Sequence, residues 1–177
     1  MRAVVGLGNP GPEYAATRHN AGYWLAEALV AHWGLPPFRR GERARFTAGD
    51  VDDTPVRVLK PTTYMNASGA ALASLRADAG FNPATDLLIL VDEFRIPTGT
   101  FRLRTEGSAG GHNGLKSIEA ALQSQQYARL RIGVGPLPDG VSDWSEYVLA
   151  PFTPEQHEQV EAITPQLIDA VETWLRQ

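Results

Sequence analysis

The stretch Leu87-Leu88-Ile89-Leu90-Val91-Asp92 decides the fold, because five apolar residues in a row are followed at once by a carboxylate. A short continuous apolar run is typical of a strand that is buried on both faces, as at the centre of a parallel sheet. In open α/β sheets, sites lie at the carboxyl ends of such strands. The run therefore predicts a central strand, with Asp92 at its carboxyl end as a candidate functional residue.

Further strands are expected on both sides of this run. Short β-rich segments alternate with turn residues and with segments of helical periodicity. The pattern predicts strands over residues 2–7, 43–50, 56–60, 100–104 and 130–134, with a hairpin turn at Asp52-Asp53. The first of these strands should end at a turn formed by Pro10, Gly11 and Pro12.

Helices are predicted between the strands, over residues 20–33, 67–79, 113–123 and 154–176. Asn20 is a candidate N-cap of the first helix, and Gly34 and Gly80 are candidate stops of the first two. In the last helix, apolar residues recur at helical spacing: Val160, Ile163, Leu167, Ile168, Val171 and Trp174. Strands interleaved with helices predict an α/β fold, a single domain over residues 1–177 built as a three-layer sandwich with a mixed, twisted sheet flanked by helices.

Composition sets limits on the chemistry and the compartment. The chain has 177 residues, of which 43% are hydrophobic, which is enough for one globular core. It has no cysteine, so disulfides and thiolate metal sites are excluded and a reducing compartment is permitted. The sequence shows no secretory signal and no membrane-spanning apolar run. We expect a soluble, cytoplasmic protein.

The charge is unevenly distributed along the chain. The net charge is -4, but residues 132–177 hold eight carboxylates against Arg176 alone, so the earlier residues are net positive. Five of the basic residues flank a second glycine-rich loop: Arg102, Arg104, Lys116, Arg129 and Arg131. They could form a patch that engages phosphates. Solvated strand edges would explain the same residues equally well.

The first glycine loop, Gly6-Leu7-Gly8-Asn9-Pro10-Gly11, matches the G-x-G-x-x-G pattern of dinucleotide-binding proteins. That function needs a helix that starts inside the glycine run and an acidic residue after the next strand. Here Pro10 and Pro12 interrupt the loop, and the nearest acid, Glu27, falls within the predicted helix. The sequence therefore argues against a dinucleotide cofactor, and we expect none.

Two histidines carry the chemistry that the sequence suggests. His19-Asn20 follows the first glycine loop, and His112-Asn113 follows the second loop, Gly107-Ser108-Ala109-Gly110-Gly111. His19 directly precedes a predicted helix, whose N-terminal field should keep its ring neutral and basic. Asp92 could orient this ring, as carboxylates orient catalytic histidines. No serine or threonine forms a nucleophile elbow, so direct attack by water is favoured over a covalent intermediate.

Four segments then show a resemblance to a known family. Matching in order and spacing, they are residues 5–22 (VGLGNPGPEYAATRHNAG), residues 60–69 (KPTTYMNASG), Asp92-Glu93, and residues 107–118 (GSAGGHNGLKSI). Together they resemble bacterial peptidyl-tRNA hydrolase from residue 3 to about residue 150. The resemblance implies a monomeric, metal-free α/β enzyme without cofactor that cuts the ester between a peptide and the tRNA 3' end. It would serve translation and ribosome rescue by recycling tRNA in the cytoplasm.

The resemblance also implies roles for individual residues. His19 would be the general base on water, Asp92 its orienting partner, and Asn9 would hold the ester and its developing negative charge. Asn66 and Asn113 would position substrate, and His112 would contact substrate from a mobile rim of the cleft. Tyr14, Tyr64 and Met65 would line the groove for the terminal nucleotide and the peptide. Arg104 and Arg131 would clamp the tRNA 5' phosphate.

The sequence departs from the family pattern in two segments, one of which is the strand before the second glycine loop, where Arg102 and Arg104 replace the lysines that the family often has. After Asp92-Glu93 the family commonly continues Leu-Asp-Leu-Pro, whereas this chain has Phe94-Arg95-Ile96-Pro97 and so should be more basic there. Two other classes of function remain as alternatives. One is a non-catalytic RNA-binding relative of the same family, and the other is a nucleotide-binding oxidoreductase.

Overall fold

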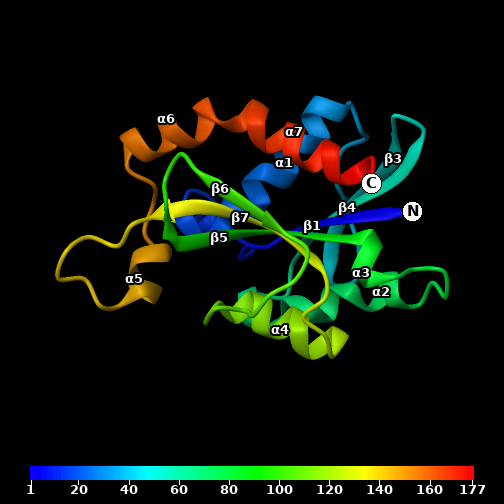
Figure 1. The fold of residues 1–177 in the computed structure, drawn as a ribbon, viewed down its shortest axis with the longest axis horizontal. Coiled ribbons are helices and arrows are strands. Elements are labelled where there is room, and N and C mark those ends of the chain that lie inside the picture. Colours follow the sequence, from blue (N-terminus) through cyan, green and yellow to red (C-terminus); the bar gives the residue numbers. More distant parts are fainter.

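A seven-stranded mixed sheet forms the centre of the protein, seen in a computed structural model that describes residues 1–177 (Figure 1). Its strands are β1 (Arg2–Gly6), β2 (Arg39–Arg40), β3 (Ala44–Val51), β4 (Thr54–Pro61), β5 (Leu87–Pro97), β6 (Phe101–Arg104) and β7 (Ala128–Gly135). Their order in the sheet is β2-β3-β4-β1-β5-β7-β6. The four inner strands β4, β1, β5 and β7 are parallel, and β2, β3 and β6 add antiparallel edges.

Strand β5 lies at the middle of the parallel part, as its apolar run predicts. All residues from Leu87 to Val91 are fully buried. The strand also runs further than expected, to Pro97, because it pairs with β7 beyond the point where β1 ends. Asp92 therefore lies within the strand, just past the last residue that pairs with β1, Leu90.

Helices cover both faces of the sheet, and the termini lie close to the same end (Figure 1). The helices are α1 (Ala21–Trp33), α2 (Ala73–Arg76), α3 (Pro83–Asp86), α4 (Asn113–Leu122), α5 (Trp144–Val148), α6 (Pro154–Ala162) and α7 (Thr164–Leu175), with 3-10 helices η1 (Pro12–Tyr14), η2 (Arg18–Asn20) and η3 (Met65–Leu72). None of the helices is long and apolar enough to cross a membrane.

The core is divided by the sheet into two layers. Leu88 and Leu90 of β5 pack with α1 and α7, whereas Ile89 and Val91 pack with η3, α2 and α4. This alternation follows from the pleat, which sends successive side chains to opposite faces. The predicted three-layer α/β sandwich with a mixed sheet is confirmed.

Two predicted helices differ from the structure. The segment 154–176 forms two helices, because Pro165 has no N–H to continue the first one and its ring would meet the carbonyl one turn back. The segment 67–79 is mostly the 3-10 helix η3 followed by the short α2. There the Gly69 N–H donates to Ser117 Oγ at 2.9 Å, so a contact with α4 replaces a helical hydrogen bond.

Candidate active site

A small cavity of about 230 Å³ lies at the carboxyl end of the parallel strands. His19 of η2 and Asn9 of the loop after β1 form part of its wall, and Asn113 is contributed by the start of α4. Close packing brings these elements together. A Cβ at Gly22 would lie 2.4 Å from the Leu90 carbonyl oxygen, and a Cβ at Gly114 would lie 2.5 Å from Met65 Sδ. Only glycine allows α1 and α4 to begin this close to their neighbours.

Asp92 and His19 form a buried pair. The His19 Nδ1 atom lies 3.0 Å and 2.9 Å from the two carboxylate oxygens of Asp92. The side chains of both residues are less than a tenth exposed. Because a carboxylate only accepts, Nδ1 carries the proton and donates it. The second ring nitrogen of His19, Nε2, is therefore left with a free lone pair.

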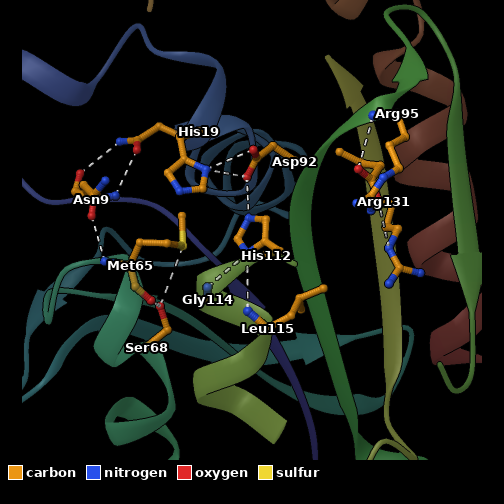
Figure 2. A network of polar contacts seen from close by, with 12 residues as sticks. Asn9, His19, Met65, Ser68, Asp92, Arg95, His112, Gly114, Leu115 and Arg131 are labelled. Atoms are coloured by element: carbon orange, nitrogen blue, oxygen red, sulfur yellow. Dashed lines mark hydrogen bonds and ion pairs between the residues drawn. The ribbon is translucent and has the colours of Figure 1, made fainter. Parts of the chain in front are cut away.

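His112 makes a second hydrogen bond to the same carboxylate. Its Nε2 lies 2.9 Å from Asp92 Oδ1, and its Nδ1 accepts from the backbone N–H groups of Gly114 and Leu115 at 3.0 and 3.3 Å. Since Nδ1 accepts, the proton sits on Nε2, which donates to Asp92. Figure 2 shows both rings directed at the Asp92 carboxylate. His112 thus lies at the centre of the site, in contact with Asp92, and not on the rim of the cleft where the resemblance placed it.

The charges of the pair perturb each other. Burial disfavours the charged form of His19, but the charge of Asp92 and its hydrogen bond outweigh burial, so the pKa of His19 is raised above its ordinary value. The effect of Asp92 on this pKa is opposite in direction to the effect expected from the N-terminal field of the helix. Burial likewise opposes ionisation of Asp92, yet His19 and His112 hold the pKa of this carboxyl well below its usual range.

Asn9 is held so that one group of its amide remains free. Its Oδ1 accepts a hydrogen bond from the Met65 N–H at 2.7 Å, which directs the Nδ2 amide NH2 group away from Met65. This NH2 group is left without a hydrogen-bond partner (Figure 2). The Asn20 side-chain amide makes two hydrogen bonds to the Asn9 backbone, accepting from its N–H and donating to its carbonyl, each at 2.9 Å. Asn20 was expected as a helix cap, but its side chain makes no capping bond and instead fixes Asn9.

The remaining groove residues surround this centre. Met65 is buried, while Asn66 and Asn113 are exposed to solvent at the cavity wall. Tyr64 is 55% exposed, and its ring meets that of Tyr14 edge-on at 6.4 Å between centroids. Tyr64 has a φ of 56°, a backbone conformation that residues other than glycine rarely adopt. Strain of this kind is commonly found at functional sites.

The arginines of the predicted basic patch divide into exposed and buried groups. Arg104 is exposed on β6, and Arg131 faces it diagonally on β7, bonded to the Ser108 carbonyl at 2.7 Å and lying 3.6 Å from Glu93. Arg129 is fully buried, so its place in a surface patch is wrong. Its guanidinium donates to four backbone carbonyls, among them Gly107 and Ser108 of the second glycine loop.

Arg95, at the position where the sequence departs from the family pattern, also holds this loop. Its Nη1 donates to the Gly110 carbonyl at 2.6 Å, and Glu93 lies 3.9 Å away. Glu93 therefore stands between Arg95 and Arg131, and both arginines contact the loop that leads to His112.

The three central residues also have the geometry of a possible cation site. One ligand atom from each of His19, Asp92 and His112 lies within 4.8 Å of the others. The two ring nitrogens that face Asp92 carry protons in the hydrogen-bond pattern described above. A cation would have to replace both protons and to break the hydrogen bonds of both histidines.

One wall of the cavity was not found from the sequence. Helix α5 contributes Trp144, Ser145 and Val148, and Leu149 follows it. The helix has only five residues and lies far along the chain from the recognisable motifs, so neither periodicity nor spacing indicated it. A buried arginine fixes it, because Arg18 donates to the Tyr147 carbonyl at 2.9 Å and lies over the Tyr147 ring.

Fold and site together define an α/β protein of enzyme type, with a histidine–carboxylate centre and a free carboxamide at the end of a parallel sheet. The peptidyl-tRNA hydrolase family matches the chain over residues 3–177. The chain belongs to the peptidyl-tRNA hydrolase family. It is 46% identical over 177 residues to a peptidyl-tRNA hydrolase of Gemmatimonas aurantiaca, covering 99% of this chain and 93% of that protein.

Two further comparisons agree. A peptidyl-tRNA hydrolase of Chloroflexus aggregans is 42% identical over 172 residues, covering 97% of this chain and 91% of the relative. The crystal structure of peptidyl-tRNA hydrolase from Acinetobacter baumannii superposes with a TM-score of 0.91 at 33% identity, covering 99% of this chain and 89% of that chain.

Proposed function

We propose that this protein hydrolyses the ester between the peptide and the 3' end of tRNA, using water activated by His19, without a covalent intermediate and without a metal. One observation carries the proposal. His19 Nδ1 is bonded to the buried Asp92 carboxylate at 3.0 and 2.9 Å, which leaves Nε2 as a base at the cavity wall. Nε2 accepts a proton from water while the hydroxide attacks the ester carbonyl, and Asp92 stabilises the imidazolium that forms. The tetrahedral intermediate then collapses with cleavage of the ester C–O bond, and the imidazolium returns its proton to the leaving 3' oxygen of tRNA.

The free Nδ2 amine of Asn9 is the donor for the negative charge that develops on the carbonyl oxygen. Its orientation is fixed before substrate binds, because Oδ1 is committed to the Met65 N–H and Asn20 holds the Asn9 backbone. A donor placed in advance costs no reorganisation during the reaction. Asn20 is therefore a positioning residue, which acts through Asn9.

His112 supports the same chemistry from behind Asp92. Its Nε2–H donates to Asp92 Oδ1, so the carboxylate receives one hydrogen bond from each ring and stays ionised. The protons on the inward-facing nitrogens occupy the place that a metal would take, which supports a mechanism without a metal.

The substrate's two halves bind on the surfaces beside this centre. Asn66 and Asn113 hold the peptide backbone with their free amides, and Tyr14 and Tyr64 offer an aromatic face for the terminal base, next to Met65. Arg104 and Arg131 bind the 5' phosphate of the acceptor end. We further propose that the protein acts as a monomer in the cytoplasm, where it returns tRNA to translation after ribosome rescue.

The proposal is tested with N-acetyl-alanyl-tRNA as substrate. The parent protein should release N-acetyl-alanine, and His19→Ala should lose at least about a hundredfold in kcat. Asn9→Asp keeps the acceptor for Met65 N–H but removes the free donor, and should also lose about a hundredfold. His32→Ala, at an exposed histidine of α1, is the matched control and should keep parental activity. Tight tRNA binding without turnover by the parent would instead support a non-catalytic RNA-binding protein.

A further inference from the structure

A second cavity adjoins the active site. It has a volume of about 700 Å³ and shares Asn9 with the cavity that contains His19. Its walls come from the loop after β1, from Tyr23 and Glu27 of α1, and from the turn between β2 and β3. A chain that is bound at His19 would have to pass Asn9 to reach this cavity, because Asn9 is the residue that lines both.

Three cations form a row along one wall of the second cavity. Arg40 of β2 lies directly opposite Arg45 of β3, and Arg45 lies directly opposite Lys60 of β4. Directly opposite residues in antiparallel strands share a face of the sheet. All three residues line the cavity, and Lys60 Nζ donates to Glu27 of α1 at 2.9 Å, which shows that the row faces α1.

Two of these cations have no acidic partner. Lys60 is paired with Glu27, but neither Arg40 nor Arg45 makes an ion pair, and Glu42, at the same cavity, pairs with neither. Like charges placed directly opposite each other on two strands destabilise the sheet. A bound anion between the two guanidinium groups would offset this repulsion, and arginine is well suited to grip a carboxylate.

The position of the pair in the sheet indicates which half of the substrate it meets. Arg104 and Arg131 lie on β6 and β7 at one edge, whereas Arg40 and Arg45 lie on β2 and β3 at the other, with β5 and Asp92 between them. If tRNA phosphate occupies the first edge and the ester lies at His19, the peptide extends toward the second edge.

We propose that the second cavity binds the peptide of peptidyl-tRNA, and that Arg40 and Arg45 favour an acidic side chain in it. This inference rests on the proposed function. From β5 the arginines are three and four strands away, or roughly 14–19 Å at about 4.8 Å per strand. An extended peptide spans about 3.4 Å per residue, so the acidic residue should lie about four to six residues from the ester.

The test compares two substrates that differ in one group. Each is a tRNA esterified to an N-acetylated hexa-alanine peptide, with Glu or Gln at the fifth residue counted back from the ester. The parent should show a kcat/KM about three- to fivefold higher for the Glu substrate, the effect of an accessible ion pair. In the double variant Arg40→Gln/Arg45→Gln the two substrates should be cleaved equally.

Arg39→Gln is the matched control. Arg39 lies on the same strand as Arg40, but it is opposite Phe46, with its guanidinium over that ring at 5.0 Å, and does not line the cavity. This variant loses one charge and should keep the preference for Glu. No preference in the parent, or a preference that survives in the double variant, overturns the inference.

Two additional measurements distinguish failure of the proposed function, and contact of the arginines with RNA, from failure of the peptide assignment alone. N-acetyl-alanyl-tRNA is too short to reach the arginines, so the parent and the double variant should cleave it equally. If the parent fails to cleave it, the proposed function fails, and the inference fails with it. Binding of uncharged tRNA should also be equal in the double variant and in Arg39→Gln. A loss confined to the double variant would mean that the arginines contact RNA, which overturns the assignment to peptide.

Discussion

At the scale of single residues, the site depends on how few hydrogen-bonding groups are left free. Asp92 receives one N–H from each of two histidines, and each ring thereby has its tautomer fixed. Asn9 commits its oxygen to Met65 and its backbone to Asn20, so only its amine faces the cavity. In the mechanism that we propose, a base and a donor are thus set in place before any substrate arrives, which is the arrangement that electrostatic catalysis needs.

The raised pKa of His19 gives a prediction about pH. The ring must be neutral to accept a proton, so kcat/KM should fall as the pH drops through a pKa above 6.5. In Asp92→Asn the carboxylate that raises this pKa is gone and burial, which lowers it, remains. The acid limb of that variant should therefore move to lower pH while kcat decreases. Rate profiles from pH 5 to 9 measure both effects, and an unmoved limb would show that Asp92 does not act on His19.

At the scale of elements, helix α4 is fixed to the site by its own cap. His112 caps the helix with Nδ1 and donates to Asp92 with Nε2. One side chain therefore joins the start of α4 to β5, just past the point where β5 stops pairing with β1. The buried Arg129 guanidinium holds the preceding glycine loop by donating hydrogen bonds to the Gly107 and Ser108 carbonyls. The glycine loop that positions the start of α4 therefore also positions the His112 ring that contacts Asp92.

Substitutions of His112 should separate the two roles. His112→Ala removes the cap and should lower the free energy of unfolding by about 1 kcal/mol, whereas His112→Asn keeps a capping oxygen and should restore most of it. Both variants lose the hydrogen bond to Asp92, so both should show a reduced kcat. Urea unfolding and single-turnover kinetics provide the two readouts. Recovery of kcat together with stability in His112→Asn would leave His112 only a structural role.

At the scale of the whole molecule, charge is divided between opposite edges of the sheet. Exposed Arg104 and half-buried Arg131 lie at the β6–β7 edge, and unpaired Arg40 and Arg45 lie at the β2–β3 edge. The net charge of -4 conceals this distribution. Local positive fields can bind an anionic partner on a protein that is acidic overall.

The salt dependence of tRNA binding should distinguish surface arginines from the buried one. Arg104→Gln should reduce the slope of log affinity against log salt by about 1, because one phosphate contact is lost. Arg129→Lys should leave the slope unchanged but destabilise the fold by roughly 2 kcal/mol, since lysine cannot satisfy four carbonyls. Fluorescence anisotropy at several salt concentrations and thermal unfolding test this, and equal slopes for Arg104→Gln and the parent would remove Arg104 from the proposed phosphate clamp.

The limits of prediction from the sequence have definite causes. The proline at position 165 could have indicated the break between α6 and α7, but the apolar periodicity on both sides of it concealed the break. Helix η3 could not be predicted, because a contact between Gly69 and Ser117 shapes it. Arg129 resembles a surface cation in the sequence, and only the carbonyls around it explain its burial.

Local pattern by itself predicted every strand except β2, as well as the α/β arrangement, and it indicated candidate residues for the chemistry, since a buried strand and a loop motif are each encoded by neighbouring residues. The tertiary structure decided how these residues act together. It brought His112 onto Asp92, turned Asn20 from a cap into a support for Asn9, and set Arg40 beside Arg45. Hydrogen bonds of this kind join atoms far apart along the chain, so their partners are selected by packing, which no local stretch of sequence contains.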